Sequence, residues 1–121
     1  MLELSRTKAD LVKMSRTDQL TGLLNRRGYL EAATGVLAKA KEAKSSAVAL
    51  MFDIDRFKAI NDQFGHDFGD KVLIEISDTM RAFGAEHGAL VARHGGEEFV
   101  ALMVRSASVL QPRLKKAACR R

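Results

Sequence analysis

A continuous apolar run from Ala47 to Phe52, followed at once by Asp53-Ile54-Asp55, restricts the fold more than any other feature of the sequence. An uninterrupted apolar run of this length is typical of a strand that is covered on both faces of a sheet. Carboxylates directly after such a strand are costly beside a core unless a cation is near. The sequence therefore predicts a central buried strand over 47–52 that ends at a polar site.

A second acidic pair lies beside two glycines further along the chain. Residues 89–93 and 97–104 are predicted to be two strands joined by a turn at Gly95-Gly96, and Glu97-Glu98 opens the second strand. Taken singly, each acidic pair is better explained as a strand-end cap or as solvated hairpin acids. Together they offer hard oxygen ligands without a His or Cys cluster, which favours magnesium or manganese and a phosphate-bearing ligand.

Apolar spacing predicts helices over 29–44, 57–64 and 71–83, with an ordered turn over 18–27. The segment 65–70 is expected to be a loop whose last residue, Asp70, caps the third helix. Helices interleaved with a few strands indicate an α+β fold, a sheet flanked by helices in an α/β sandwich.

Length and charge narrow the functional classes. The 121 residues suffice for one domain. Residues 1–104 hold 14 Lys and Arg against 15 Asp and Glu, whereas residues 105–121 hold six basic residues and no acidic one, so the net charge of +5 belongs to that tail. Without aromatic interleaving or a groove-binding helix motif, this tail does not predict nucleic-acid binding.

Compartment and the N-terminal segment are inferred from other features. No apolar run is long enough to span a membrane, no leader is evident, and the single Cys119 supports neither a disulfide nor a zinc site. We expect a cytoplasmic segment without membrane contact, within a parent protein that could itself be anchored. Residues 1–16 are expected to form a connecting helix, which either pairs with a twin, leads in from an upstream sensory domain, or frays.

Four ordered motifs carry a resemblance to the GGDEF family of diguanylate cyclases, in its GGEEF form. The resemblance covers about residues 16–104. Because all four motifs occur in the family's order, it is far more specific than a GGEE string alone. The matching segments are Asp18–Arg27 (DQLTGLLNRR), Asp53–Asp62 (DIDRFKAIND), Phe64–Asp70 (FGHDFGD) and Arg93–Phe99 (RHGGEEF).

The resemblance implies a nucleotide-cyclase-like, mainly antiparallel sheet flanked by helices, lacking the last strands and helices of the full domain. It also implies that two GTP molecules on two facing copies condense into cyclic di-GMP and pyrophosphate. Asp53, the carbonyl of Ile54 and Glu97 would hold Mg²⁺ or Mn²⁺, with Glu98 a weaker candidate. Glu97 would also accept the proton of the attacking hydroxyl.

The substrate contacts implied by the resemblance lie between those acids. Asn61 and Asp70 would read guanine, since an amide and a carboxylate can bond its edge. Lys58 and the amides of Arg56 and Phe57 would cradle the phosphates, although Lys58 taken alone is no more than a solvated lysine. His66 either orders its loop or touches the ligand.

The expected organisation is thus a connecting helix over 1–16, a partial GGDEF domain over 17–104 and an atypical basic tail over 105–121. Two functions remain open. The first is a diguanylate cyclase domain acting as a head-to-head homodimer. The second is a catalytically inactive GTP-binding or dimerising signalling module.

Overall fold

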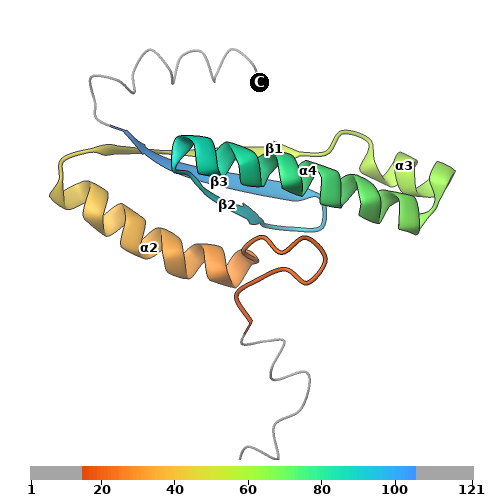
Figure 1. Ribbon diagram of the computed structural model, residues 1–121, viewed down its shortest axis with the longest axis horizontal. Coiled ribbons are helices and arrows are strands. Elements are labelled where there is room, and N and C mark those ends of the chain that lie inside the picture. Colours follow the sequence, from red (N-terminus) through yellow and green to blue (C-terminus); the bar gives the residue numbers. More distant parts are fainter. Residues whose placement is uncertain (1–14, 106–121) are drawn as a thin grey trace, which may run out of the picture.

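The computed structural model describes residues 15–105, which form a three-stranded antiparallel sheet with helices packed against it (Figure 1). The strand order is β1-β3-β2, and both neighbouring pairs are antiparallel. This confirms the α+β class with a central antiparallel sheet flanked by helices. In chain order the elements are α2 (Arg26–Glu42), β1 (Ser46–Asp53), α3 (Phe57–Phe64), α4 (His66–His87), β2 (Leu90–Arg93) and β3 (Glu98–Arg105).

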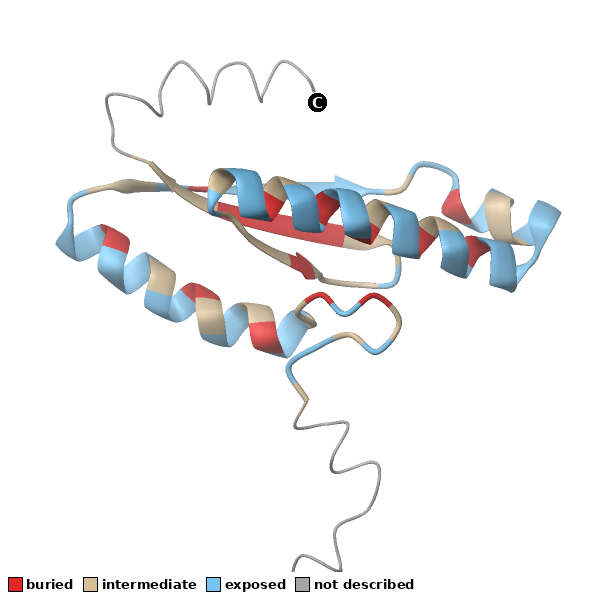
Figure 2. Ribbon diagram, viewed as in Figure 1, coloured by how far each residue is buried: buried red, intermediate tan, exposed pale blue. Residues whose placement is uncertain are grey.

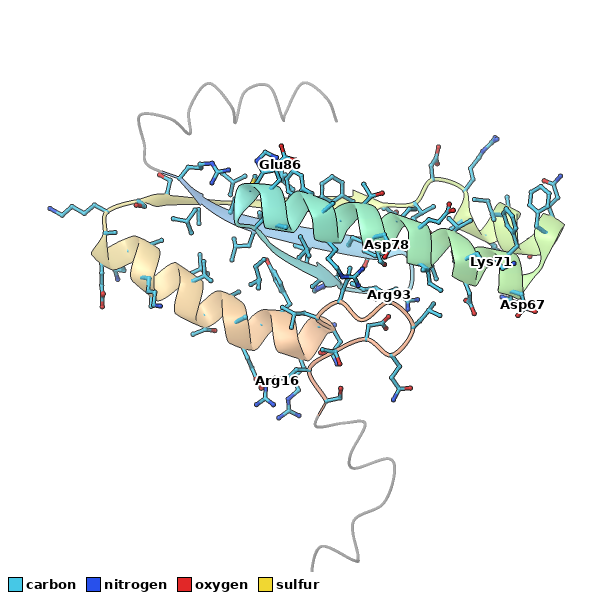
Figure 3. The ribbon with its side chains drawn as sticks, viewed as in Figure 1. Arg16, Asp67, Lys71, Asp78, Glu86 and Arg93 are labelled. Atoms are coloured by element: carbon cyan, nitrogen blue, oxygen red, sulfur yellow. The ribbon has the colours of Figure 1, made fainter. Side chains whose placement is uncertain are left out.

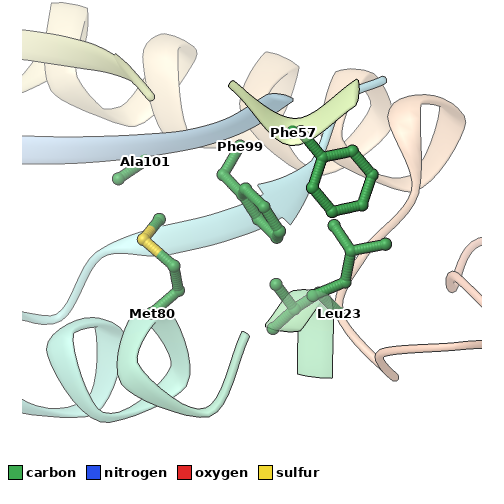
Figure 4. Close-up of a cluster of buried hydrophobic side chains, with 6 residues drawn as sticks. Leu23, Phe57, Met80, Phe99 and Ala101 are labelled. Carbon is green, nitrogen blue, oxygen red and sulfur yellow. The ribbon is translucent and has the colours of Figure 1, made fainter. Parts of the chain in front are cut away.

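The middle strand β3 holds the core. Its residues 99–102 are all buried, and Phe99 and Ala101 have no exposed surface (Figure 2). Because successive side chains of a strand point to opposite faces, β3 must be covered on both sides. Phe99 and Ala101 cluster with Met80 and Leu73 of α4 (Figure 4). Leu23, from the turn before α2, and Phe57 of α3 complete this cluster. Helix α2 contacts all three strands.

Helix α2 starts three residues earlier than its apolar pattern predicts, because Asn25 caps it. The Asn25 Oδ1 accepts a hydrogen bond of 2.8 Å from the amide of Gly28, which satisfies one of the free N–H groups of the first turn. Gly28 has no room for a side chain, since a Cβ there would lie 2.1 Å from the carbonyl oxygen of Arg16. The helix start is therefore fixed by the turn that precedes it.

The expected loop over 65–70 is wrong, and so is the expected N-cap at Asp70. Helix α4 already begins at His66 and continues past 83 to His87, so Asp70 lies inside it. Gly65, at φ +92°, makes the sharp break that separates α3 from α4, and Gly88, at φ +61°, ends α4. Helix α4 is thus bounded at both ends by a glycine with positive φ, a conformation that glycine adopts easily.

Strand β1 also differs from its prediction as a central, doubly covered strand. Within the described residues it pairs only with β3, and most of its side chains are exposed. Met51 and Phe52 remain 47% and 41% exposed. The apolar run does form the predicted strand, but no described segment pairs with its outer edge or covers these two side chains.

The two ends of the chain lie largely outside the described residues. The predicted connecting helix over 1–16 falls there except for Ser15 and Arg16, which are not helical. The predicted tail over 105–121 falls there except for Arg105, which still belongs to β3. Among the helices that the structure describes, none combines the length and the apolar character needed to cross a bilayer.

Candidate functional site

The strand register brings the two predicted acidic segments together. Asp53, the last residue of β1, is directly opposite Glu98, the first residue of β3. One residue further on, the amide of Ile54 donates a 3.1 Å hydrogen bond to the carbonyl oxygen of Glu97. Opposite residues of an antiparallel pair lie on the same face with their Cβ atoms about 5 Å apart. Like charges in that position repel each other, and a bound cation would relieve the repulsion.

These acids do not form a metal centre by themselves. Within residues 15–105, no group of three or more His, Cys, Asp and Glu side chains is placed so that it could hold a metal ion. Asp53 and Glu97 with the carbonyl of Ile54 are all hard oxygen donors, which suit a small divalent cation. Such a donor set fits an ion that takes its remaining ligands from water or from a phosphate-bearing substrate.

The turn between β2 and β3 is closed by backbone hydrogen bonds to Glu98. The amides of His94 and Gly95 both donate to the carbonyl oxygen of Glu98, at 2.7 and 3.3 Å. A Cβ on Gly95 would lie 2.7 Å from the Glu98 Oε1, whereas one on Gly96 would meet nothing within 4 Å. Gly95 therefore makes room for the Glu98 carboxylate, while Gly96 leaves an open surface beside the acids.

An ordered turn over 15–25 supports this hairpin from the side. Arg93 of β2 reaches the turn (Figure 3), where it donates to both carboxylate oxygens of Asp18 at 3.1–3.2 Å, and it also donates to the carbonyl oxygen of Gly96 at 2.7 and 3.0 Å. The Arg93 guanidinium thus connects the 15–25 turn to the Gly95-Gly96 turn, which directly precedes Glu97. Arg81 of α4 donates to the carbonyl oxygen of Thr21 at 2.6 Å and anchors the turn a second time.

The electrostatics of Asp18 agree with this supporting role. Burial on its own would raise the pKa of the Asp18 carboxyl, but hydrogen bonds from the Thr21 hydroxyl and amide and from Arg93 outweigh burial and hold the pKa below its ordinary value of 3.8. An open groove of about 450 Å³ lies between the 15–25 turn and the β2–β3 hairpin. Its lining includes Asn25, Arg26 and Gly96. Sequence analysis identified the turn but not its ion pair, although Asp18 and Arg93 both lie in the motifs.

The start of α3 offers backbone donors close to Asp53. Arg56 precedes the helix in the left-handed conformation, at φ +59°, and no side chain caps the free N–H groups of the first turn. The side chain of Phe57 is buried in the core, while Lys58 is exposed. Uncapped N–H groups at a helix start, with a lysine beside them, are suited to binding an anion.

The predicted base-reading residues lie where α3 and α4 meet. Asn61 is on α3, and its buried Oδ1 has no hydrogen-bond partner. That oxygen packs against Gly69 of α4, and the exposed Asp70 follows Gly69 directly. His66, the first residue of α4, is also exposed. The fold thus places Asn61 of α3 against Gly69 of α4, the residue directly before Asp70, and the sequence analysis assigned no role to Gly69.

The candidate site residues therefore lie along one continuous stretch of the fold. The hairpin acids face the end of β1, the start of α3 follows, and the α3–α4 junction completes the stretch. A buried polar atom without a partner, such as the Asn61 Oδ1 beside Gly69, is uncommon in folded proteins.

Two curated proteins are similar in sequence to most of this chain. Diguanylate cyclase DgcP of Escherichia coli (strain K12) is 37% identical over 98 residues, which are 81% of this chain and 28% of that protein. Response regulator PleD of Caulobacter vibrioides (strain NA1000 / CB15N) is 43% identical over 96 residues, which are 76% of this chain and 20% of that protein. The chain thus spans between a fifth and three tenths of the length of these two relatives.

Solved structures show the same fold. The GGDEF domain of DgcB from Caulobacter crescentus, crystallised in complex with c-di-GMP, superposes with a TM-score of 0.72 at 33% identity, covering 85% of this chain and 60% of that one. The family model described as "Diguanylate cyclase, GGDEF domain" matches residues 15–120. On this match, and on a fold shared with solved members, the chain belongs to the GGDEF family of diguanylate cyclase domains.

Proposed function

We propose that this domain is one half of a diguanylate cyclase, which condenses two GTP molecules into cyclic di-GMP and pyrophosphate. Each half would bind one GTP, and two copies would face each other head to head. In each of two steps the 3′-oxygen of one GTP bonds to the α-phosphorus of the other, the bond to the β-phosphate oxygen breaks, and pyrophosphate leaves. The 3′-hydroxyl proton passes to Glu97. Because GTP is a cytoplasmic nucleotide, the proposed reaction belongs in the cytoplasm.

The observation that carries this proposal is the β1–β3 register. It sets Asp53 opposite Glu98 and bonds Ile54 to Glu97, so that the oxygen donors come from two paired segments. Asp53, the carbonyl of Ile54 and Glu97, with Glu98 in support, would hold Mg²⁺ or Mn²⁺. When bound, the ion would neutralise phosphate charge and lower the pKa of the attacking hydroxyl.

The other contacts follow from the same stretch of the fold. Lys58 and the amides of Arg56 and Phe57 would bind the phosphates at the uncapped start of α3. At the helix junction Asn61 and Asp70 would read the guanine edge. His66, exposed at the start of α4, would contact the ligand or order the junction.

A catalytically inactive GTP-binding or dimerising module is the second candidate. It is favoured by the exposure of Phe52, directly before Asp53, and by the outer edge of β1, which pairs with nothing in the part of the chain that the structure describes. With β1 paired on one side only, the domain would bind GTP through α3 and α4 and yet misplace the carboxylates. In both cases we expect a second copy, and a sensory domain upstream in the parent protein, as partners.

Product analysis separates the two candidates. Purified protein is incubated with GTP and Mg²⁺, the nucleotides are separated by chromatography, and GTP binding is measured in parallel by calorimetry. Cyclic di-GMP in the product supports the cyclase. GTP binding without formation of cyclic di-GMP would instead support the catalytically inactive binding module.

Matched variants assign the roles. Glu97→Gln is expected to abolish product while GTP still binds, and Asn61→Ala is expected chiefly to weaken GTP binding. Glu75→Gln, an exposed change on the outer side of α4, is the control and should behave as the unaltered chain. Turnover retained in Glu97→Gln would show that another group accepts the proton.

A further inference from the structure

Gly69 occupies a place in α4 where a side chain fits only if the Asn61 amide moves. A Cβ there would lie 1.8 Å from the Oδ1 of Asn61, 2.9 Å from its Cγ and 3.3 Å from the Cζ of Phe57. Carbon and oxygen atoms that are not bonded to each other do not approach so closely. The Asn61 amide of α3 therefore occupies the space that any side chain at position 69 would need.

The amide is the group that would have to move. Phe57 is only 9% exposed and belongs to the core cluster with Phe99 and Leu73, so its ring is fixed by packing. The Asn61 amide is the end of a side chain with two rotatable bonds, and its Oδ1 has no hydrogen bond to hold it. A methyl group on residue 69 would thus turn the Asn61 amide out of its position, whereas the Phe57 ring, 3.3 Å away, would have to shift by only a few tenths of an ångström.

We propose that Gly69 is a specificity-determining positioning residue, which sets the preference for guanine by leaving room for the Asn61 amide. The inference rests on the proposed function, in which Asn61 and Asp70 read the base. Gly69 itself donates nothing to the nucleotide. Its lack of a side chain leaves the amide of α3 room next to Asp70, the following residue, so that both side chains can meet one base edge.

The test compares GTP and ATP binding in the presence of Mg²⁺, measured by calorimetry on the full chain. Gly69→Ala is expected to weaken GTP binding about tenfold, which corresponds to about 1.4 kcal/mol and to the loss of one hydrogen bond, and to leave ATP binding unchanged. If Gly69→Ala instead destabilised α4 as a whole, the binding of GTP and the binding of ATP would weaken alike. The ratio of the two dissociation constants therefore separates positioning from a merely structural role.

A double-mutant cycle isolates the contact. If the Gly69→Ala change acts through Asn61, then adding it to Asn61→Ala should change GTP affinity less than about twofold, because the displaced side chain is already gone. The double variant also keeps the test usable if Gly69→Ala folds poorly, since removal of the amide makes room for the methyl group. Gly35→Ala in α2, where a Cβ meets nothing within 4 Å, is the matched control and should bind as the unaltered chain does.

The outcomes are distinguishable. A Gly69→Ala chain that keeps the full preference for GTP over ATP overturns the inference, while the proposed function stands. The inference is also overturned if Gly69→Ala lowers GTP affinity equally in the chain with Asn61 and in the Asn61→Ala variant. An unaltered chain that binds GTP no better than ATP overturns the proposed function, and the inference with it.

Discussion

Replacing Asp18 with Asn removes a charge and preserves the size of the side chain. The carboxylate accepts hydrogen bonds from the Thr21 amide at 2.9 Å, from the Thr21 hydroxyl at 2.8 Å, and from Arg93 at 3.1–3.2 Å. The Asp18 and Arg93 side chains are only 21% and 17% exposed, so water screens the pair weakly. Hydrogen bonds to charged groups contribute about 1.5–3 kcal/mol. We expect Asp18→Asn to lower the free energy of unfolding by about 2 kcal/mol.

Thermal and urea unfolding, followed by circular dichroism, measure this loss. A change of about 2 kcal/mol corresponds to a fall of roughly 10 °C in the melting temperature of a domain of this size. In a double-mutant cycle with Arg93→Met, the two losses should sum to more than the loss in the double variant, because each single change already breaks the pair. Purely additive losses would mean that the two side chains do not interact in solution.

The effect also has a defined pH dependence. The pKa of Asp18 is lower in the folded chain than its ordinary value of 3.8, so the folded state favours the charged carboxylate. The stabilisation is therefore fully present above pH 3.8 and is lost as the pH falls through the lower pKa of the folded state. The stability gap between the unaltered chain and Asp18→Asn should be constant near neutral pH and should close in acid.

Glu31→Gln is the matched control. Glu31 also pairs with arginines, Arg16 and Arg27, but its side chain is 42% exposed and such surface pairs contribute little. We expect no measurable change in melting temperature. An Asp18→Asn chain that melts at the same temperature as the unaltered chain, or a gap that persists unchanged in acid, would refute the reasoning about the turn.

Three further changes test the packing. Phe99→Ala, at a position with no exposed surface, should cost about 3–5 kcal/mol in urea unfolding. Gly28→Ala should lower the melting temperature, since its Cβ would lie 2.1 Å from the main-chain oxygen of Arg16; an unchanged value would show that the turn moves freely. Arg56→Gly should raise the melting temperature by a few degrees, because glycine adopts φ +59° without the cost of about 1 kcal/mol for a left-handed residue.

Periodicity predicted the elements well where local signals dominate. The 29–44, 57–64 and 89–104 segments form the expected helices and hairpin, with boundaries moved by a few residues. The Asn25 cap moved the start of α2, because a cap is set by one side chain rather than by apolar spacing. Gly69 and Asp70 suggested a loop, yet α4 runs through both, and Gly69 lies where the Asn61 amide of α3 packs against α4.

Contacts between distant segments could not be read from spacing. The motifs predicted that Asp53 and Glu97 would meet, but the pairing of Asp53 with Glu98 follows from a register that no local pattern encodes. The same holds for the Asp18–Arg93 ion pair, whose partners are 75 residues apart. The apolar run predicts a doubly covered β1, because the hydrophobicity of a strand indicates how strongly it tends to be buried and not which segment buries it.

The β1–β3 ladder determines where this domain tolerates changes in length. The ladder runs without a bulge from Ser46 opposite Arg105 to Asp53 opposite Glu98. Deleting one residue within β1 would turn every later side chain of the strand, Asp53 included, to the other face and separate Asp53 from Glu98. Insertions after α2, or between α4 and β2, lie outside the ladder and leave its pairing unchanged. These two connections are therefore the natural positions for inserted segments or reporter fusions.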